Sequence, residues 1–369
     1  MSHSVQVQIN GATLSLETGR VAKQAEGAVV VRCGGTIVLS TVVATKTPME
    51  GRDFLPLTVE YRERAYAGGK IPGGFFKREG RPDEKETLTC RLIDRPVRPL
   101  FPKNFRNEIQ VINLVISADD ENDPDVLAMV GSSAALCLSG LPFAGPLGAV
   151  RVGVVDGKLV ANPTYKQIAA SPLELVIAGT EDHIMMVESG AKEVSEEQLL
   201  EALAFGHEQC KQLVRIQKDL ASQAAKPRWA FNAAAAADPA LEAKVKELAT
   251  AKMVQALAVN EKQARAQALG AIFEEVFAAI GGDDEVRAKA REYFEKVEKA
   301  EVRRLIVDKG IRVDGRSVTE VRPIWSEVGY LPRAHGSALF TRGETQTLVA
   351  ATLGTKNDEQ KMESFEGDT

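Results

Sequence analysis

The sequence predicts an α+β fold in which two strand-rich regions flank a block of long helices. Near the N-terminus, β-branched runs at 29–31 and 36–43 are separated by Gly34 and Gly35, a pattern typical of a β-hairpin. From residue 195 the composition shifts to Ala, Lys and Glu, which favours helices. A third region then repeats the first hairpin. With 369 residues, the chain has room for two or three domains.

The first predicted domain comprises residues 1–194 and alternates strands with short helices. Strands are expected at 109–117, 148–155 and 173–179, and a helix is expected at 124–138. Strands with helices laid against them form one packed core. The apolar stretch at 126–150 contains Gly, Ser and Pro residues, so it predicts a buried helix and a turn and not a membrane span.

The second predicted domain comprises residues 195–310 and is all helical. Ser195 and Gln198 form a capping-box pattern at its start, and Gly310 marks its end. Its many charges are interpreted as solvated helix faces. It is expected to connect the two strand-rich regions.

The third region, residues 311–369, is the start of a second copy of the first fold. Residues 26–43 align without a gap on 335–352 at a constant offset of 309, which pairs Gly27 with Gly336. Glycines at matching places indicate one β-fold used twice. Chance similarity of two hairpins is the alternative. This segment is too short to close a core of its own.

Composition and cysteine spacing exclude several classes of protein. The 44% hydrophobic and 26% charged content excludes a disordered or collagen-like chain. The four cysteines show no C-x-x-C pair, which disfavours a zinc site or a disulfide framework and suits a reducing cytoplasm. Residues 1–12 have no signal-peptide pattern. The four histidines are scattered, and no catalytic triad is visible.

Residues 61–106 are basic in a chain of net charge −5. They contain twelve Lys/Arg and six Asp/Glu, a local charge of +6 that leaves −11 elsewhere, together with six of the 20 aromatic residues. Cations interleaved with aromatic rings suit single-stranded nucleic acid, because cations bind phosphates and rings stack on unpaired bases. A basic surface with its aromatics in the core is the alternative.

A glycine-rich loop at 68–82 lies within this segment. It is not a nucleotide-binding P-loop, because Ile71 follows Lys70 where Ser or Thr is required. Phe75 and Phe76 are adjacent in a polar loop, so at least one ring is expected at the surface. A stacking role and a hydrophobic contact with a partner subunit are both open.

A helix capped by residues 83–86 and ended by Pro96 is expected to follow the loop. Arg91 and Arg95 are four residues apart on one face, and Arg98 lies just beyond the end. These guanidinium groups could bind phosphate or the RNA backbone, or they could form structural ion pairs with Asp94 and nearby Glu residues. The acidic turn at 119–125 lacks the glycine and the terminal glutamate of a calcium loop, so it is interpreted as a helix N-cap.

Two long motifs resemble a known family. One is Phe-Phe-Lys-Arg-Glu-Gly-Arg-Pro at 75–82, continuing through 86–102, and the other spans 331–346. Both closely resemble the bacterial polynucleotide phosphorylase family. The resemblance covers the whole chain and implies an RNase PH-like (ribosomal protein S5 domain 2-like) β-α-β-α core, an all-helical linker domain and the incomplete start of a second RNase PH-like core.

The resemblance also implies a function. Family members form a homotrimeric ring around a channel, in which single-stranded RNA is shortened from its 3′ end. Inorganic phosphate is the co-substrate, Mg²⁺ assists, nucleoside 5′-diphosphates are released, and polymerisation is the reverse reaction. The implied setting is the cytoplasm, without a membrane partner, and RNase E and other RNA-degradation machinery are implied partners.

Site residues carried over from the family lie in the basic segment. Phe75 and Phe76 would stack on bases at a constriction of the channel, while Lys77 and Arg78 hold phosphates. The family usually has two arginines here, so Lys77 replaces a bidentate group by a point charge. The remaining RNA-binding residues implied are Arg91, Arg95 and Arg98.

The catalytic groups of the family are not expected within residues 1–369. The phosphate-binding serine turn of the active repeat corresponds here to Asp123, Pro124 and Asp125, whose carboxylates would repel phosphate. The first domain is therefore predicted to be catalytically silent. The catalytic residues and the Mg²⁺ ligands are expected beyond Thr369. A nucleotidyltransferase is the favoured interpretation, and a non-catalytic ring scaffold that channels RNA and an RNase PH-type phosphorylase of tRNA 3′ ends are the alternatives.

Overall fold

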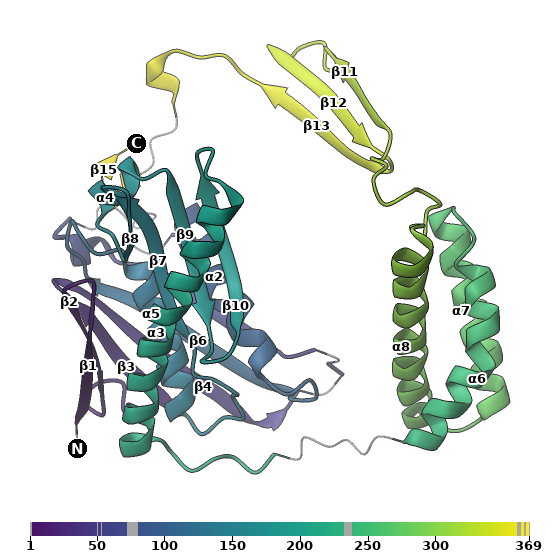
Figure 1. Ribbon diagram of the computed structural model, residues 1–369, viewed down its shortest axis with the longest axis horizontal. Coiled ribbons are helices and arrows are strands. Elements are labelled where there is room, and N and C mark those ends of the chain that lie inside the picture. Colours follow the sequence, from purple (N-terminus) through teal and green to yellow (C-terminus); the bar gives the residue numbers. More distant parts are fainter. Residues whose placement is uncertain are drawn as a thin grey trace. The chain divides into compact units, whose positions relative to one another are not determined.

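The computed structural model describes residues 2–49, 51–52, 54–71, 80–231 and 238–359, together with the backbone of 363–364 and 367–368. The chain forms two compact units (Figure 1). Unit 1 comprises Met1–Ala235 and Lys361–Thr369, and unit 2 comprises Ala236–Gln360. Among the described residues, no helix is long and apolar enough to span a membrane.

Unit 1 contains a six-stranded sheet with the order β1-β2-β3-β4-β6-β5. Its neighbouring strands are antiparallel except for β5 and β6, which are parallel. The strands are β1 (His3–Ile9), β2 (Ala12–Thr18), β3 (Gly27–Cys33), β4 (Thr36–Pro48), β5 (Leu57–Glu63) and β6 (Asn107–Ser117). The connection from β5 to β6 carries a short 3-10 helix (Ala65–Gly68), α2 (Glu84–Val97) and a second 3-10 turn (Arg98–Leu100).

A second, antiparallel sheet of unit 1 has the order β10-β9-β7-β8. Its strands are β7 (Gly148–Val155), β8 (Lys158–Ala161), β9 (Leu173–Gly179) and β10 (Ile184–Ala191), and the short helix α4 (Tyr165–Ala170) follows β8. This sheet follows in the chain directly after the central helix α3.

Helix α3 (Pro124–Leu138) is the centre of the unit 1 core. Fourteen of its fifteen residues are buried, and it contacts β3, β4 and β7. The close approach of α3 to β3 requires glycine on both elements. A Cβ on Gly27 would lie 1.9 Å from the carbonyl oxygen of Ala135, and a Cβ on Gly131 would lie 2.3 Å from Ser40 Oγ. Small residues therefore fix the distance between helix and sheet.

Helix α5 (Glu196–Ala224) packs on the sheets of unit 1. It contacts β7, β9 and β1, and it buries an apolar stripe that includes Ala202, Cys210, Leu213 and Leu220. The predicted capping box of Ser195 with Gln198 is present at its start. The helix is therefore part of the first core, because its apolar face needs the sheets for burial.

The helical part of unit 2 consists of α6 (Pro239–Ala256), α7 (Lys262–Ile280) and α8 (Asp284–Lys309). Their contact buries Val245, Ala249, Met253, Phe273 and Phe294. The side chains of Asp238, Glu261 and Asp283 accept hydrogen bonds from backbone N–H groups at the three N-termini. These caps satisfy donors that have no partner within a helix.

The second hairpin reproduces the first. Strands β11 (Ile324–Val328), β12 (Gly336–Arg342) and β13 (Thr345–Ala351) form an antiparallel sheet. Gly336 pairs with Ala351 as Gly27 pairs with Val42, and each further pair of β12 and β13 matches a pair of β3 and β4 at the offset of 309. The shared register confirms the internal repeat. A 3-10 turn (Lys356–Asp358) and the short strands β14 (Glu363–Ser364) and β15 (Gly367–Asp368) follow.

Candidate functional site

Helix α2 carries the arginines selected from the sequence, and its N-terminus is fixed to strand β5. The Asp83 side chain accepts a hydrogen bond from the Glu86 backbone N–H at 2.7 Å, and the Glu86 side chain accepts one from the Asp83 N–H at 2.9 Å. Glu86 is buried and also accepts from the backbone N–H of Glu63 at 2.7 Å. The predicted cap therefore also connects α2 to the sheet. Pro96 does not end the helix, which continues through Val97.

Arg98 is held by other groups of the protein. Its guanidinium donates to both carboxylate oxygens of Asp94, at 2.9 and 2.7 Å. It also donates to the carbonyl oxygens of Leu55 at 2.8 Å and Leu57 at 3.1 Å. Four hydrogen bonds to protein atoms leave little capacity for a ligand, because a guanidinium has five N–H donors. Of the two alternatives, the structural ion pair describes Arg98.

The side chains of Arg91 and Arg95 are exposed on the surface of α2. Arg95 Nη1 lies 2.7 Å from a carboxylate oxygen of Glu188 on β10, and both side chains are more than half exposed. Arg91 is exposed and makes no hydrogen bond or ion pair with its side chain to any residue that the structure describes. An exposed ion pair is weak, so both cations are available to an anionic ligand.

The glycine-rich loop is described only at its two ends. Phe75, Phe76, Lys77 and Arg78 lie outside the described residues. On the N-terminal side Ile71 is 91% exposed. On the C-terminal side Arg62 Nη2 donates to the carbonyl oxygen of Gly80 at 2.9 Å. The C-terminal end of the loop is therefore attached to β5.

Three of the six aromatic residues in the basic segment belong to the core. Tyr61, Phe101 and Phe105 are at most 5% exposed, and the rings of Phe101 and Phe105 stack with centroids 6.0 Å apart. Tyr66 is 56% exposed. For the three buried rings, the alternative of a basic surface over core aromatics is therefore correct.

The carboxylates of Asp123 and Asp125 at the start of α3 are paired with Arg151 of β7. Arg151 Nη2 donates to Asp123 Oδ2 at 3.0 Å and to Asp125 Oδ2. Burial raises the pKa of Asp125 to about 6, although the Arg151 charge opposes the shift. The sequence predicted a helix N-cap here and two carboxylates that would repel phosphate, but no cationic partner for them. In the structure both carboxylates form ion pairs with Arg151.

Asp119, which begins the acidic turn, holds the β3–β4 hairpin against the start of α3. Its carboxylate accepts from Gly35 N at 2.7 Å and from Asn122 N at 2.8 Å. Partial burial raises the pKa of Asp119, but hydrogen bonds from Asn122, Glu121 and Gly35 outweigh it and leave the pKa below its ordinary value. In the part of the chain that the structure describes, no three His, Cys, Asp or Glu residues are grouped to hold a metal ion.

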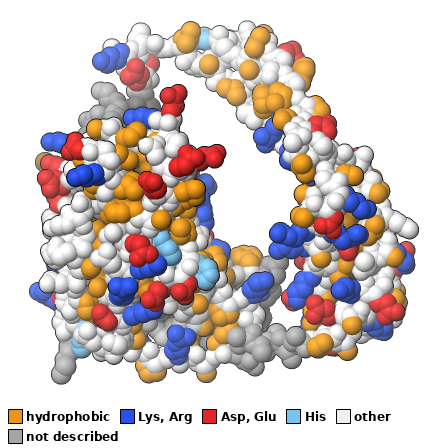
Figure 2. All heavy atoms as spheres, in the orientation of Figure 1, with side chains coloured by type: hydrophobic (Ala, Val, Ile, Leu, Met, Phe, Trp, Pro, Cys, Tyr) orange, Lys and Arg blue, Asp and Glu red, His pale blue; other side chains and the backbone are white. Residues whose placement is uncertain are grey.

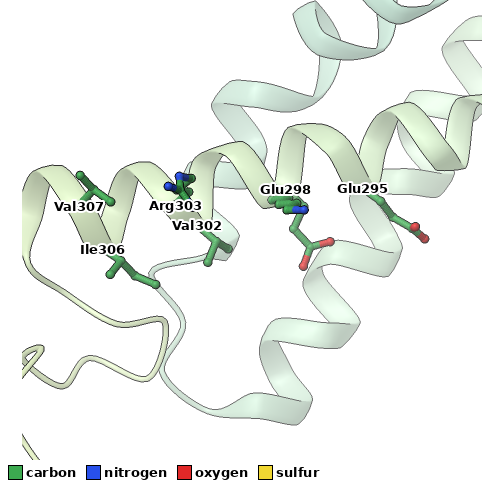
Figure 3. A pocket seen from close by; sticks show the side chains of 7 residues that line it. Glu295, Glu298, Val302, Arg303, Ile306 and Val307 are labelled. Carbon is green, nitrogen blue, oxygen red and sulfur yellow. The ribbon is translucent and has the colours of Figure 1, made fainter. Parts of the chain in front are cut away.

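A groove of about 430 Å³ runs along α8 of unit 2 (Figure 3). Val302, Ile306 and Val307 give it an apolar lining, with Lys299 and Arg303 beside them. Neither cation makes an ion pair with a described residue, whereas other cations of α8 pair along the helix, as Lys296 does with Glu292. In Figure 2, Lys and Arg side chains are interspersed with Asp and Glu on this unit.

Comparison with known families accounts for this order of domains. The model of the 3′ exoribonuclease family, domain 1, matches residues 12–142 and again 320–368, and domain 2 of the same family matches 145–209. The model described as polyribonucleotide nucleotidyltransferase, RNA binding domain, matches 240–317. The chain belongs to the polyribonucleotide nucleotidyltransferase family. The double match of domain 1 confirms the repeat, and the family has the predicted RNase PH-like cores and helical domain.

Curated relatives agree along nearly the whole chain. The polyribonucleotide nucleotidyltransferase of Acidiphilium cryptum is 53% identical over 97% of this chain, and that of Geobacter sulfurreducens is 51% identical over 100%. The relative from Caulobacter vibrioides is 53% identical over 98%. The chain spans about half the length of these relatives. The solved structure of rice Rrp46 shares 15% identity and a TM-score of 0.46, over 58% of this chain and 96% of that one, which is too low to support an argument.

Sequence reasoning missed two features that the structure and the family make visible. It did not connect Arg151 with the acidic turn, since 26 residues separate Arg151 from Asp125. It also interpreted the charges of the helical block as solvated faces, whereas the family's description calls this region RNA binding. The sequence carries no clear signal for the second, because Glu295 lies four residues before Lys299 in the order that favours an ion pair on a helix.

Proposed function

We propose that this chain is part of a phosphate-dependent 3′-to-5′ exoribonuclease that degrades single-stranded RNA to nucleoside 5′-diphosphates, and that it supplies RNA-binding surface and ring scaffold. The supporting observation is identity above 50% to polyribonucleotide nucleotidyltransferases along 97% or more of the chain. The three family models also follow one another in chain order.

The proposed reaction is phosphorolysis. An oxygen of inorganic phosphate bonds to the phosphorus of the 3′-terminal nucleotide, and the bond from that phosphorus to the 3′ oxygen of the preceding nucleotide breaks. The released 3′ oxygen gains a proton, and the terminal nucleotide leaves as a diphosphate. Magnesium would neutralise phosphate charge. The described residues offer no ligand set for it, so no step is assigned to the ion.

The proposed RNA contacts in unit 1 are of two kinds. Phe75 and Phe76 stack on bases. Lys77, Arg78, Arg91 and Arg95 neutralise phosphates. The surface position of Arg91 and the exposed pairing of Arg95 support this role. Arg98 is assigned a positioning role, because its hydrogen bonds connect α2 to the segment leading into β5.

A second RNA contact is proposed on the helical domain. Lys299 and Arg303 are the cations of the α8 groove that remain without an acidic partner among the described residues. The domain matches the RNA binding domain of the family. Two cations one helical turn apart can contact neighbouring phosphates of an extended strand.

The division into domains at 1–194, 195–310 and 311–369 is kept as a proposal, in which α5 is the part of the helical domain that packs on the first core. We further propose a homotrimer, a cytoplasmic setting, and docking of RNase E or other RNA-degradation proteins outside the ring. The cytoplasmic setting is supported by the four cysteines, all of which are free.

RNA binding by the whole chain tests the proposal. Fluorescence anisotropy with a labelled 20-nucleotide oligo(A) should show that F75A/F76A binds about tenfold more weakly or worse, because stacking contributes ~1–3 kcal/mol per base. Leu200→Ala, which removes an exposed apolar side chain from α5, is the matched control and should bind like wild type. Unchanged affinity of the folded F75A/F76A protein would contradict the stacking role.

The phosphate contacts are tested by the dependence of RNA affinity on salt concentration. The variant R91A/R95A should lower the slope of log Kd against log salt by about 1.4, since each phosphate contact on a single strand contributes ~0.7. K158A/K192A removes two surface cations from the second sheet region and should leave the slope unchanged. Equal slopes for wild type and R91A/R95A would exclude α2 from the RNA path.

A further inference from the structure

Two arginines of α8 lie over phenylalanine rings of α7 in unit 2, in a cluster whose residues differ from those of the groove in Figure 3. Arg287 Cζ is 5.3 Å from the ring centroid of Phe273 and 4.8 Å from that of Phe277. Arg291 Cζ, one turn further along α8, is 4.7 Å from the Phe273 centroid. Cation–π attraction therefore fixes both guanidinium groups against aromatic rings.

The cluster borders a hollow of about 490 Å³, which is large enough for a nucleotide. Its lining includes Arg287, Arg291, Glu274 and Asp284. The side chains of Arg287 and Arg291 are 39% and 50% exposed. Each guanidinium thus has a ring on one side and remains accessible to a ligand on the other.

Most of the hydrogen-bonding capacity of the two arginines is unused. Arg287 Nη2 donates to Glu274 Oε1 at 2.5 Å, and Arg291 Nε donates to Glu295 Oε1 at 3.1 Å. A guanidinium has five N–H donors, and neither side chain makes another hydrogen bond with a residue that the structure describes. The exposed carboxylate of Asp284 has no ion pair or hydrogen bond within the same part of the chain.

The charges that line the hollow are balanced. Arg287 and Arg291 are positive, and Glu274 and Asp284 are negative. A phosphate group would meet repulsion from the two carboxylates, whereas a neutral planar molecule with both donors and acceptors is matched by this lining. An unpaired nucleobase is such a molecule, because bases stack on guanidinium planes and form hydrogen bonds along their edges.

Guanine matches these groups better than the other bases of RNA. Its O6 and N7 accept from a guanidinium, and its N1–H and amino group donate to a carboxylate. Adenine lacks the O6 acceptor, and the pyrimidines lack N7.

We propose that the hollow between α7 and α8 binds an unpaired guanine of the RNA strand. One of the guanidinium groups of Arg287 and Arg291 stacks on the base and the other donates to O6 and N7, while Asp284 accepts from N1–H or the amino group. This inference rests on the proposed binding of single-stranded RNA. It adds a base preference to contacts that otherwise neutralise phosphates or stack on any base.

Fluorescence anisotropy of the whole chain at constant salt tests the proposal with three labelled 20-nucleotide strands. The first is oligo(A), the second has guanosine at every fifth position, and the third has 7-deazaguanosine at those positions. Wild type should bind the second strand at least about fivefold more tightly than the first, which is the smallest discrimination expected of a bidentate contact to guanine. The third strand should lose most of this preference, because 7-deazaguanine has no N7 acceptor.

The variant R287K/R291K keeps both charges but removes the planar groups, so it should lose the preference for the second strand. The control R215K/R304K makes the same change at two exposed arginines outside the hollow and should keep the preference of wild type. A cluster that only holds α7 against α8 predicts a lower melting temperature for R287K/R291K with an unchanged preference. The preference is a ratio of two affinities, so a general loss of RNA binding does not alter it.

Two results would overturn the proposal. One is equal affinity of wild type for the first and second strands, and the other is an unchanged preference in folded R287K/R291K. Should that variant fail to fold, the third strand decides, since it needs only the wild-type protein, and binding as tight as that of the second strand contradicts the site. Binding of oligo(A) without a preference for guanosine would remove the guanine site and leave the proposed function intact. Absence of binding to all three strands would contradict both.

Discussion

The hairpins β3–β4 and β12–β13 share a register and an offset of 309 residues, yet they lie in different surroundings. Helix α3 covers the first hairpin, and a Cβ added at Gly27 would overlap the backbone of that helix. At the matching Gly336, the nearest atom to an added Cβ is the Cβ of Ala351, at 3.5 Å. On the same face Phe340 is 41% exposed, whereas its counterpart Val31 is fully buried.

This difference shows that a glycine can be required by packing and not by backbone conformation. Neither Gly27 nor Gly336 has a positive φ, but Gly34 and Gly343 at the two turns do, at 56° and 60°. The turn glycines are therefore needed by each hairpin alone. The strand glycine is needed where a helix lies against it.

The largest expected effect follows from adding one methyl group. Gly27→Ala places a Cβ against the carbonyl of Ala135 and should lower the free energy of unfolding of unit 1 by about 3 kcal/mol or more. Gly336→Ala should change unit 2 by less than about 0.5 kcal/mol. Urea unfolding followed by Trp229 in a W325F background, and by Trp325 in a W229F background, reports on the two units separately. Equal effects of the two substitutions would remove the distinction between the hairpins.

The second expected effect is a dependence of stability on pH. It concerns only the hairpin β3–β4, because Asp125 belongs to the helix α3 that covers it. Burial raises the pKa of Asp125 to about 6, so the folded state holds this proton more tightly than the unfolded chain. Between about pH 4 and 6, the free energy of unfolding should fall as pH rises, by at most about 3 kcal/mol from this group. Asp125→Asn should remove that part of the slope, as measured by urea unfolding across this range.

Asp119 provides a control, because its pKa is shifted in the opposite direction to that of Asp125. Its pKa is lowered in the fold, so its stabilising contribution is present above the ordinary pKa of an aspartate and is lost as pH falls through the folded value. Asp119→Asn should therefore flatten an acid-side loss of stability and leave the slope near pH 5 to 6 unchanged. Identical pH profiles for wild type and D125N would show that Asp125 titrates normally.

A third test exchanges two residues at matching positions of the hairpins, Ser40 and Val349, and compares the stability of the two variants. Ser40 Oγ donates to Asn113 Oδ1 at 2.6 Å in the buried contact with α3, and its counterpart in the second hairpin is Val349. Ser40→Val should cost about 2 kcal/mol, because it removes a buried hydrogen bond and crowds Gly131. Val349→Ser should be nearly neutral, since residue 349 is 49% exposed. Thermal unfolding of both variants measures the difference, and a destabilised V349S would contradict the account.

The smallest expected effect is one that the two hairpins share. Gly34→Ala and Gly343→Ala should each cost about 1 kcal/mol, because both turns hold a positive φ. Asn122 and Asp119 lie near Gly34, and Arg322 lies near Gly343, so the former substitution should be slightly worse. The same urea titrations detect this. A cost at one turn only would show that the turns differ in conformation.

Much of the fold was predictable because local patterns agree with packing. The helix expected at 124–138 and the strands at 148–155 and 173–179 match α3, β7 and β9. The packing of α5 was not predictable from composition, because this helix belongs to the Ala-, Lys- and Glu-containing region after residue 195 but packs on the sheets of unit 1. The spacing of the apolar residues in α5 predicts one buried face, although the overall composition of the helix does not.

The candidate site was predictable only in part, since sequence spacing does not reveal partners. Arg91, Arg95 and Arg98 look alike in the sequence, but only Arg98 donates to the carbonyls of Leu55 and Leu57. Arg151 joins Asp125 across 26 residues through the packing of β7 beside α3. Such contacts depend on tertiary structure, which no local pattern encodes.

Release of ADP from poly(A) by the wild-type chain, with phosphate and Mg²⁺ supplied, tests the central claim most directly. We propose that residues 1–369 bind RNA but contain no complete phosphorolytic site, because Asp123 and Asp125 stand where the family's phosphate-binding turn is expected. The account predicts poly(A) binding without detectable ADP. Phosphate-dependent ADP release at the rate of a full-length family member would contradict it.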